Sequence, residues 1–186
     1  LSCITGITGY LEIENSITTS IDLSNATFVD DELNIHDNDD LEEVDLSSLT
    51  SIGNYFYLNS NGDLSDIEIS SLEEVGGTLS INSNSSLDVL NLTSLTGVRG
   101  ELQINNNYTL DEVTMPVLEE VEGSFQVEGN EILDVVSAPS LSDISGQLYI
   151  NYHFNLSEID LSSLVSVGSN FTIQNNYGLE TVALTS

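Results

Sequence analysis

A repeat of 23 residues runs through almost the whole chain and constrains its fold more than any other feature. Its clearest column holds an apolar residue in each unit, and a second apolar residue follows two positions later, from Ile35 to Ile173. Five further apolar columns keep the same spacing. Such a register indicates repeated units that bury their apolar faces against each other. The first column contains Leu33, Phe56, Leu79, Leu102, Phe125, Leu148 and Phe171.

The spacing within one unit favours strands. Leu33 and Ile35 lie two residues apart, as do Val44 and Leu46, and a period of two places side chains on one face of a strand. β-Branched residues are common at the apolar positions, and Gly, Asn, Asp and Ser fill the gaps between them. The sequence therefore predicts an all-β fold, a parallel β-helix or leucine-rich-repeat-like solenoid of about eight coils.

The repeat also predicts the domain organisation. We expect residues 1–186 to form a single solenoid domain. Residues 32–186 give seven coils of 23 residues, the last truncated, and residues 10–31 give a first coil that is one residue shorter. Residues 1–9 are expected to form an N-terminal cap or part of a preceding coil. Because the sequence stops within a coil, we expect a fragment of a longer surface protein or a subunit of an extracellular fibre.

The charge of the chain restricts its partners. Thirty-one Asp and Glu residues face a single basic residue, Arg99, so the formal net charge is −30. Direct binding to nucleic acid or to an anionic membrane requires Lys and Arg, which argues against both. Hydrophobic residues make up 39% of the chain and recur regularly, unlike those of a disordered acidic tail. No apolar run is long enough to span a bilayer as a helix.

One polar column interrupts the apolar pattern. It lies five residues after the first apolar position and contains asparagine in six of the seven 23-residue units, with His153 in the other. Asparagine can turn the chain and bond its amide to its equivalents in the neighbouring coils, so we predict an inward structural ladder. The ladder comprises Asn38, Asn61, Asn84, Asn107, Asn130 and Asn176.

The residues that alternate with the first apolar pair are expected to point outward. They form a broad face of amides and tyrosines with few charges, which suits sugars or a protein surface. A solvated sheet face without a ligand is the alternative interpretation. The candidate binding face consists of Asn34, Tyr57, Asn59, Asn82, Gln103, Asn105, Gln126, Tyr149 and Asn151.

Acidic residues gather on two turn edges, and the densest group contains Asp37, Asp39 and Asp40. Oxygen ligands suit Ca²⁺, although the spacing lacks the glycine and the terminal glutamate of an EF-hand loop. Two interpretations stay open: a specific Ca²⁺ site at these residues, or a diffuse atmosphere of counterions around them. No other cofactor is expected.

The sequence gives little support to catalysis. His36 and His153 lie five coils apart and cannot share a site, and Cys3 has no histidine near it in sequence. We therefore expect a protein that is not an enzyme. Cleavage of polysaccharides by paired carboxylates, which β-helices can support, is the enzymatic alternative.

Asn-x-Ser/Thr sequons indicate modification of a secreted chain. Asn84 and Asn107 belong to the predicted inward ladder and should be poor acceptors. The single cysteine, Cys3, cannot close a bridge within the chain and could instead bond to a partner or a cap. The better glycosylation candidates are Asn25, Asn91, Asn155 and Asn170.

Units such as Gly76–Asn84, followed by Leu87, Leu90 and Leu92, resemble the repeat of the receptor L-domain superfamily. The chain is most similar to the sporulation-specific and cell-wall proteins of fungi and protists, many of which carry GPI anchors. The resemblance implies a right-handed solenoid that is secreted and has no catalytic activity. Two features depart from it, because relatives usually cap the solenoid with disulfides and carry more Lys and Arg.

Together these observations predict an extracellular structural or adhesion module of a cell surface, cell wall or fibre. A receptor-type ectodomain that binds a glycan or a protein is the alternative. Expected partners are proteins or glycans at a cell surface, and the chain could also assemble with itself, end to end or laterally. Neither nucleic acid nor direct membrane insertion is expected.

Overall fold

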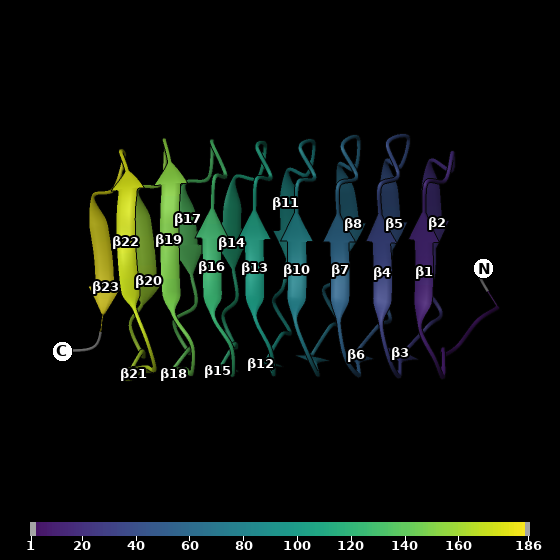
Figure 1. Cartoon of the computed structure of the whole chain (residues 1–186), viewed down its shortest axis with the longest axis horizontal. Helices are drawn as coiled ribbons and strands as arrows, with labels where there is room; N and C mark the ends of the chain where they lie inside the picture. Colours follow the sequence, from purple (N-terminus) through teal and green to yellow (C-terminus); the bar gives the residue numbers. More distant parts are fainter. Residues whose placement is uncertain (1–2, 185–186) are drawn as a thin grey trace.

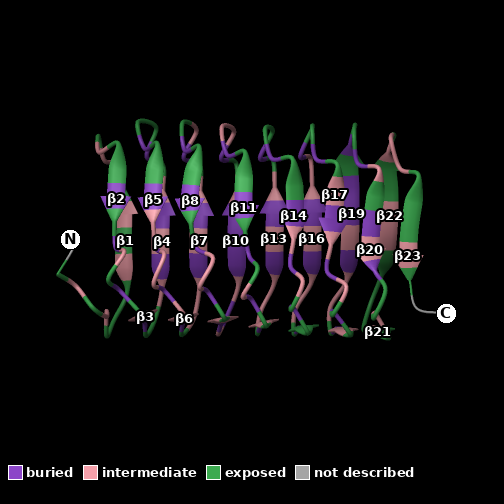
Figure 2. Cartoon of the chain, turned by 180° about the vertical axis from the view of Figure 1, so that it is seen from behind, coloured by how far each residue is buried: buried purple, intermediate pink, exposed green. Residues whose placement is uncertain are grey.

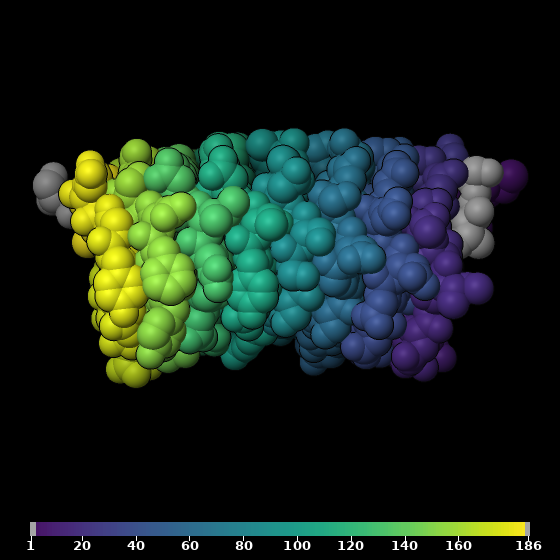
Figure 3. Space-filling model, turned by 90° about the horizontal axis from the view of Figure 1, so that it is seen from above, coloured from purple at the N-terminus to yellow at the C-terminus, as the bar shows by residue number. Residues whose placement is uncertain are grey.

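The computed structural model describes residues 3–184, which form 23 strands and no helix. The strands lie across a rod whose two ends carry the two termini (Figure 1). Each coil contributes one strand to each of three rows, except that the last described coil has strands only in the first two, and all pairings between coils are parallel. Colour bands follow one another along the rod in sequence order (Figure 3). The predicted parallel β-solenoid of about eight coils is thereby confirmed.

The first row is a continuous sheet of eight strands at the front of Figure 1. Leu79 pairs with Phe56 on one side and with Leu102 on the other, so the register keeps the 23-residue repeat. The strands are β1 (Leu11–Glu14), β4 (Leu33–His36), β7 (Phe56–Asn59), β10 (Leu79–Asn82), β13 (Leu102–Asn105), β16 (Phe125–Glu128), β19 (Leu148–His153) and β22 (Phe171–Asn176).

The second row lies behind the first and comes to the front in Figure 2. It is divided into a sheet of three strands and a sheet of five, because β8 and β11 are not paired. The strands are β2 (Ser20–Asp22), β5 (Glu43–Asp45), β8 (Asp66–Glu68), β11 (Val89–Asn91), β14 (Glu112–Thr114), β17 (Val135–Ser137), β20 (Glu158–Leu161) and β23 (Thr181–Leu184).

The third row runs along the lower edge of Figure 1 and consists of seven strands of two residues each. At the N-terminal end, Ile7 makes a parallel bridge to Val29, so residues before the first coil continue this row. The strands are β3 (Phe28–Val29), β6 (Ser51–Ile52), β9 (Glu74–Val75), β12 (Gly97–Val98), β15 (Glu120–Val121), β18 (Asp143–Ile144) and β21 (Ser166–Val167).

The core fills the space between the three rows. The apolar columns of the repeat are buried throughout the middle coils, where Leu79, Ile81 and Leu87 are each 0% exposed. Only at the two ends are such residues partly exposed, for example Leu11 and Leu179. Figure 2 shows the same distribution, with buried segments in the middle of the rod. The described residues form no helix with the length and hydrophobicity that crossing a membrane requires.

The corner after each third-row strand brings backbones of neighbouring coils very close together. A Cβ added at Gly76 would lie 2.1 Å from the carbonyl oxygen of Gly53, and one added at Gly53 would lie 1.9 Å from that of Asp30. In the next three coils the tight position lies one residue later, at Gly100, Gly123 and Gly146, and it returns to the first register at Gly168. Only glycine permits this approach without moving the backbone.

We predict that Gly76→Ala lowers the free energy of unfolding by about 1–3 kcal/mol, because the new methyl group overlaps a backbone atom that cannot rotate away. Gly62→Ala is the matched control in the same coil, since its nearest non-neighbouring atom would be Ser85 Oγ at 3.8 Å. This control should change stability by less than about 0.5 kcal/mol. Urea denaturation of both variants measures the difference, and equal stabilities would contradict the proposed close approach.

Candidate functional site

The asparagine ladder occupies the inside of the turn between the first and second rows. Its five asparagines from Asn38 to Asn130 are 0% exposed, while Asn176 in the last coil is partly exposed. The residue before each ladder position has a positive φ, and so does Asn15 before Ser16 in the first coil; the values lie between 48° and 65°. These left-handed residues, which the sequence did not reveal, are Asn15, Asp37, Ser60, Ser83, Asn106, Gly129, Tyr152 and Asn175.

The ladder amides bond mainly to backbone groups of the neighbouring coil. Asn84 Nδ2 donates to the carbonyl oxygen of Leu58 at 2.8 Å, and Asn84 Oδ1 accepts the backbone N–H of Asn61 at 3.1 Å. Direct bonds between amides are also present, as from Asn61 Nδ2 to Asn84 Oδ1 at 3.2 Å. Buried backbone groups need such partners, so the geometry gives these asparagines a structural role.

His153 replaces one ladder asparagine and is itself 0% exposed. Its Nδ1 lies 3.0 Å from the carbonyl oxygen of Asn130, and its Nε2 lies 3.1 Å from that of Val127. Burial lowers the pKa of His153, although both carbonyls and the Glu128 carboxylate act in the opposite direction. A neutral imidazole carries one N–H, so only one of the two carbonyls receives a hydrogen bond.

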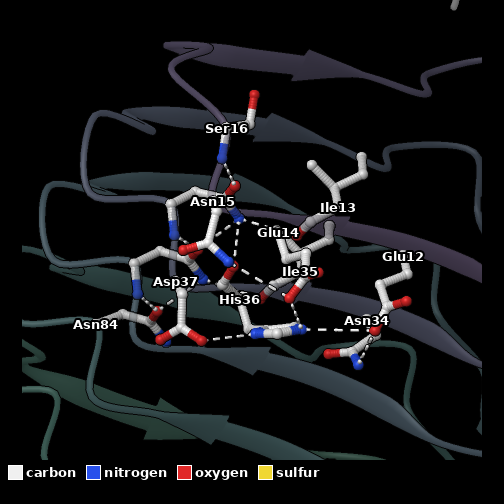
Figure 4. A network of polar contacts seen from close by, with 12 residues as sticks. Glu12, Ile13, Glu14, Asn15, Ser16, Asn34, Ile35, His36, Asp37 and Asn84 are labelled. Atoms are coloured by element: carbon white, nitrogen blue, oxygen red, sulfur yellow. Dashed lines mark hydrogen bonds and ion pairs between the residues drawn. The ribbon is translucent and has the colours of Figure 1, made fainter.

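The other histidine, His36, lies at the surface of β4 among three carboxylates (Figure 4). Its Nδ1 is 2.8 Å from Asp37 Oδ2, and its Nε2 is 3.6 Å from Glu12 Oε1 and 3.8 Å from Glu14 Oε2. The hydrogen bond with Asp37, together with the charges of Asp37 and Glu14, raises the pKa of His36 above its usual value. The cationic form therefore connects β1 to β4.

Arg99, the single Lys or Arg of the chain, lies at the corner after the third-row strand β12. Arg99 Nε donates to Glu74 Oε1 at 2.6 Å, and Arg99 Nη1 donates to Glu122 Oε1 at 3.3 Å. These glutamates belong to the coils before and after Arg99, so the guanidinium bridges three coils. The pairing raises the pKa of Arg99 further.

The candidate binding face covers the outside of the first sheet, but its amides are largely engaged with each other. Asn59 Oδ1 accepts the backbone N–H of Asn82 at 3.0 Å, and Asn82 Nδ2 donates to Ser80 Oγ at 2.7 Å. Asn151 is 0% exposed, because neighbouring side chains of the same outer face cover it. Its amide is held by Tyr149 Oη at 2.7 Å.

The other members of this face are only half-buried, so they remain within reach of a partner. Tyr57 packs beside Tyr55 with ring centroids 5.5 Å apart. Asn105 Oδ1 is buried without a hydrogen-bond partner among the described residues. The half-buried members are Asn34, Tyr57, Asn59, Asn82, Gln103, Asn105, Gln126 and Tyr149.

Asp37, Asp39 and Asp40 all lie exposed on one turn. Within residues 3–184, no three His, Cys, Asp or Glu side chains come together in a way that could hold a metal ion. Asp37 is instead directed toward His36. The calcium prediction for this turn therefore still rests on the sequence alone.

The four preferred glycosylation candidates, Asn25, Asn91, Asn155 and Asn170, are exposed. The two sequon asparagines of the ladder, Asn84 and Asn107, are 0% exposed and bonded, as their inward position predicts. Cys3 is exposed and makes no disulfide. His36 and His153 lie on β4 and β19, which four further strands of the first sheet separate.

The described surface has shallow grooves. One, of about 320 Å³, lies over β11 and β14 and is lined by residues that include Val89, Asn91, Asp111 and Glu112. Another, of about 310 Å³, lies at the C-terminal end beside Phe171 and Leu184. Neither groove contains a histidine or a cysteine among its lining residues.

We predict that His153→Asn stabilises the fold by about 1 kcal/mol, because asparagine restores the amide pattern of the other buried positions. The lowered pKa of His153 also gives the sign of a pH effect. Its contribution to stability is present above the unfolded-state pKa and is lost as the pH falls. The advantage of the variant should therefore grow between pH 7 and pH 5 in urea denaturation. A variant less stable than the parent at every pH would refute this.

We predict the opposite sign for His36→Gln. Since the pKa of His36 is raised, its stabilising contribution is complete below the unfolded-state pKa and disappears as the pH rises through the folded-state value. The variant should expose the amides of β1 to faster hydrogen exchange at acidic pH and match the parent at alkaline pH. Equal exchange rates at acidic pH would show that the carboxylates do not hold His36.

No protein-family model, curated protein or solved structure that was compared with the chain matches it.

Proposed function

We propose that the chain is a non-enzymatic extracellular module with a structural or adhesive role at a cell surface, a cell wall or an extracellular fibre. One observation carries this proposal: the rod keeps its rows of strands along nearly its whole length (Figure 1), and polar residues fill much of its exposed surface. Repeat proteins of this kind act through extended surfaces and spacing. Proteins or glycans of a cell surface are the proposed partners, and self-association through the rod ends or sides belongs to the same proposal.

A ligand-binding ectodomain is the second candidate, with the outer face of the first sheet as its site. The half-buried Tyr57 and Tyr149 favour it, because aromatic rings beside amides offer both apolar area and hydrogen bonds to a glycan or a protein. The bonds among neighbouring amides weigh against it, since a ligand would have to replace them.

An adhesion assay separates these candidates. Beads coated with the chain are tested for retention on isolated fungal cell walls, beside beads coated with the Tyr57→Ala/Tyr149→Ala variant. A structural or adhesive rod should retain both kinds of beads within about twofold, because many contacts share the load. Loss of retention in the variant alone would favour the ectodomain. Circular dichroism on both proteins controls for folding.

The same material tests the enzymatic alternative. Cell-wall polysaccharides are incubated with the chain, and new reducing ends are measured over time. We expect none above the level of a heat-inactivated control. Reducing ends that appear with the chain and disappear in Asp111→Asn/Glu112→Gln, two acids of the β11–β14 groove, would overturn the proposal.

A further inference from the structure

The outer side of the turn between the first and second rows changes its chemistry along the rod. This surface, here called the turn edge, consists of residues 37–40, 60–63, 83–86, 106–109, 129–132, 152–155 and 175–178. Its N-terminal coils expose Asp37, Asp39, Asp40 and Asp63, while the equivalent turn of the short first coil exposes a single large apolar side chain, Ile17. Its C-terminal coils expose large apolar side chains, between 43% and 70% of each being accessible. These are Tyr108, Ile132, Tyr152, Phe154 and Tyr177.

The aromatic part of the turn edge is ordered before any partner binds. Phe154 and Tyr177 occupy equivalent positions in successive coils, and their rings are parallel to within 15° with centroids 5.8 Å apart. Each follows a ladder residue, His153 or Asn176, whose side chain bonds to the backbone of the coil before it. Figure 3 looks down on this edge and shows no segment of the described chain covering its green and yellow coils. Exposed apolar patches of this kind mark interaction surfaces, and their order lowers the entropic cost of binding.

Carboxylates accompany the apolar residues in the same four coils. Asp111, Asp134, Glu158 and Glu180 are exposed and follow the apolar residue of their coil by two to four positions. Asp134 accepts a hydrogen bond from Ser157. Within residues 3–184, the ion pairs of the chain involve only His36 and Arg99, and none includes these four acids. Negative charges that form no ion pair within the described chain thus follow the aromatic part of the turn edge closely in sequence.

We propose that this aromatic part of the turn edge binds an arginine-bearing cationic segment of a partner protein. A guanidinium group stacks on the faces of Phe154 and Tyr177, and neighbouring basic groups pair with the carboxylates. The net charge of −30 adds long-range attraction for such a segment. A neutral glycan gains nothing from that charge, and the Asn175 amide beside the rings is already bonded to Asn151. The inference rests on the proposed adhesive role and specifies its partner.

Fluorescence anisotropy with two labelled peptides tests this inference. One peptide alternates Arg with Gly, and the other has Lys in place of Arg. We expect the parent chain to bind the Arg peptide more tightly, and Phe154→Ser/Tyr177→Ser to weaken that binding about tenfold while changing Lys-peptide binding little. Both substitutions are at exposed positions, so the melting temperature should stay within a few degrees of the parent value.

Two control variants separate stacking from general charge attraction. Tyr10→Ser removes an exposed aromatic ring at the other end of the rod and should leave binding of both peptides unchanged. Asp37→Asn/Asp39→Asn/Asp40→Asn removes charge but no ring and should weaken both peptides equally. Equal binding of the Arg and Lys peptides, with no effect of Phe154→Ser/Tyr177→Ser, would overturn the inference.

Other outcomes of these experiments distinguish a failure of this inference from a failure of the proposed function. Salt-insensitive binding of neutral β-glucan oligomers that Phe154→Ser/Tyr177→Ser abolishes would replace the cationic segment by a glycan. Failure of the peptide experiment with continued retention of beads would reject the inference alone. New reducing ends from polysaccharide would instead reject the proposed function.

Discussion

Hydrogen bonds between successive coils run along the rod and hold each residue beside its equivalent 23 positions away. A side chain that suits one coil therefore meets a copy of its own environment in the next. Inside the turn, this condition selects asparagine, whose amide both donates to and accepts from the neighbouring backbone. At the corner after the third-row strands the same condition selects glycine, because the backbones of neighbouring coils lie in contact there. The apolar columns follow the same rule, since each core residue packs on its equivalents above and below.

Much of this architecture could be predicted from the sequence. The pairing register between neighbouring 23-residue coils is constant, so aligning one pair of coils correctly aligns the others. Pairing Leu33 with Phe56 places every strand of the first row, and the column through Asn38 and Asn61 identifies the buried ladder. The left-handed residues could not be found in the same way. Ser60 and Tyr152 share no chemistry, and their positive φ is imposed by the turn that contains them.

The candidate site was harder to predict because it depends on bonds between side chains. Asn151 alternates with apolar residues as an outward residue should, yet Tyr149 and Glu128 enclose its amide. Two of the three acids around His36, Glu12 and Glu14, come from the short first coil, and aligning Leu11 with Leu33 would have placed Glu14 beside it. The aromatic turn edge corresponds to the column Tyr108, Glu131, Phe154 and Tyr177, but the repeat alone does not show that these aromatic side chains are exposed.

The orientation of the strands has a mechanical consequence. The strands lie across the rod, and the termini lie at opposite ends. Tension between the termini therefore loads the hydrogen bonds between one pair of neighbouring coils at a time. Coils then peel from an end in sequence instead of shearing together. Each released coil turns a rise of about 4.8 Å into as much as about 80 Å of extended chain. A rod built in this way can lengthen stepwise under load while the coils that have not peeled keep their surface.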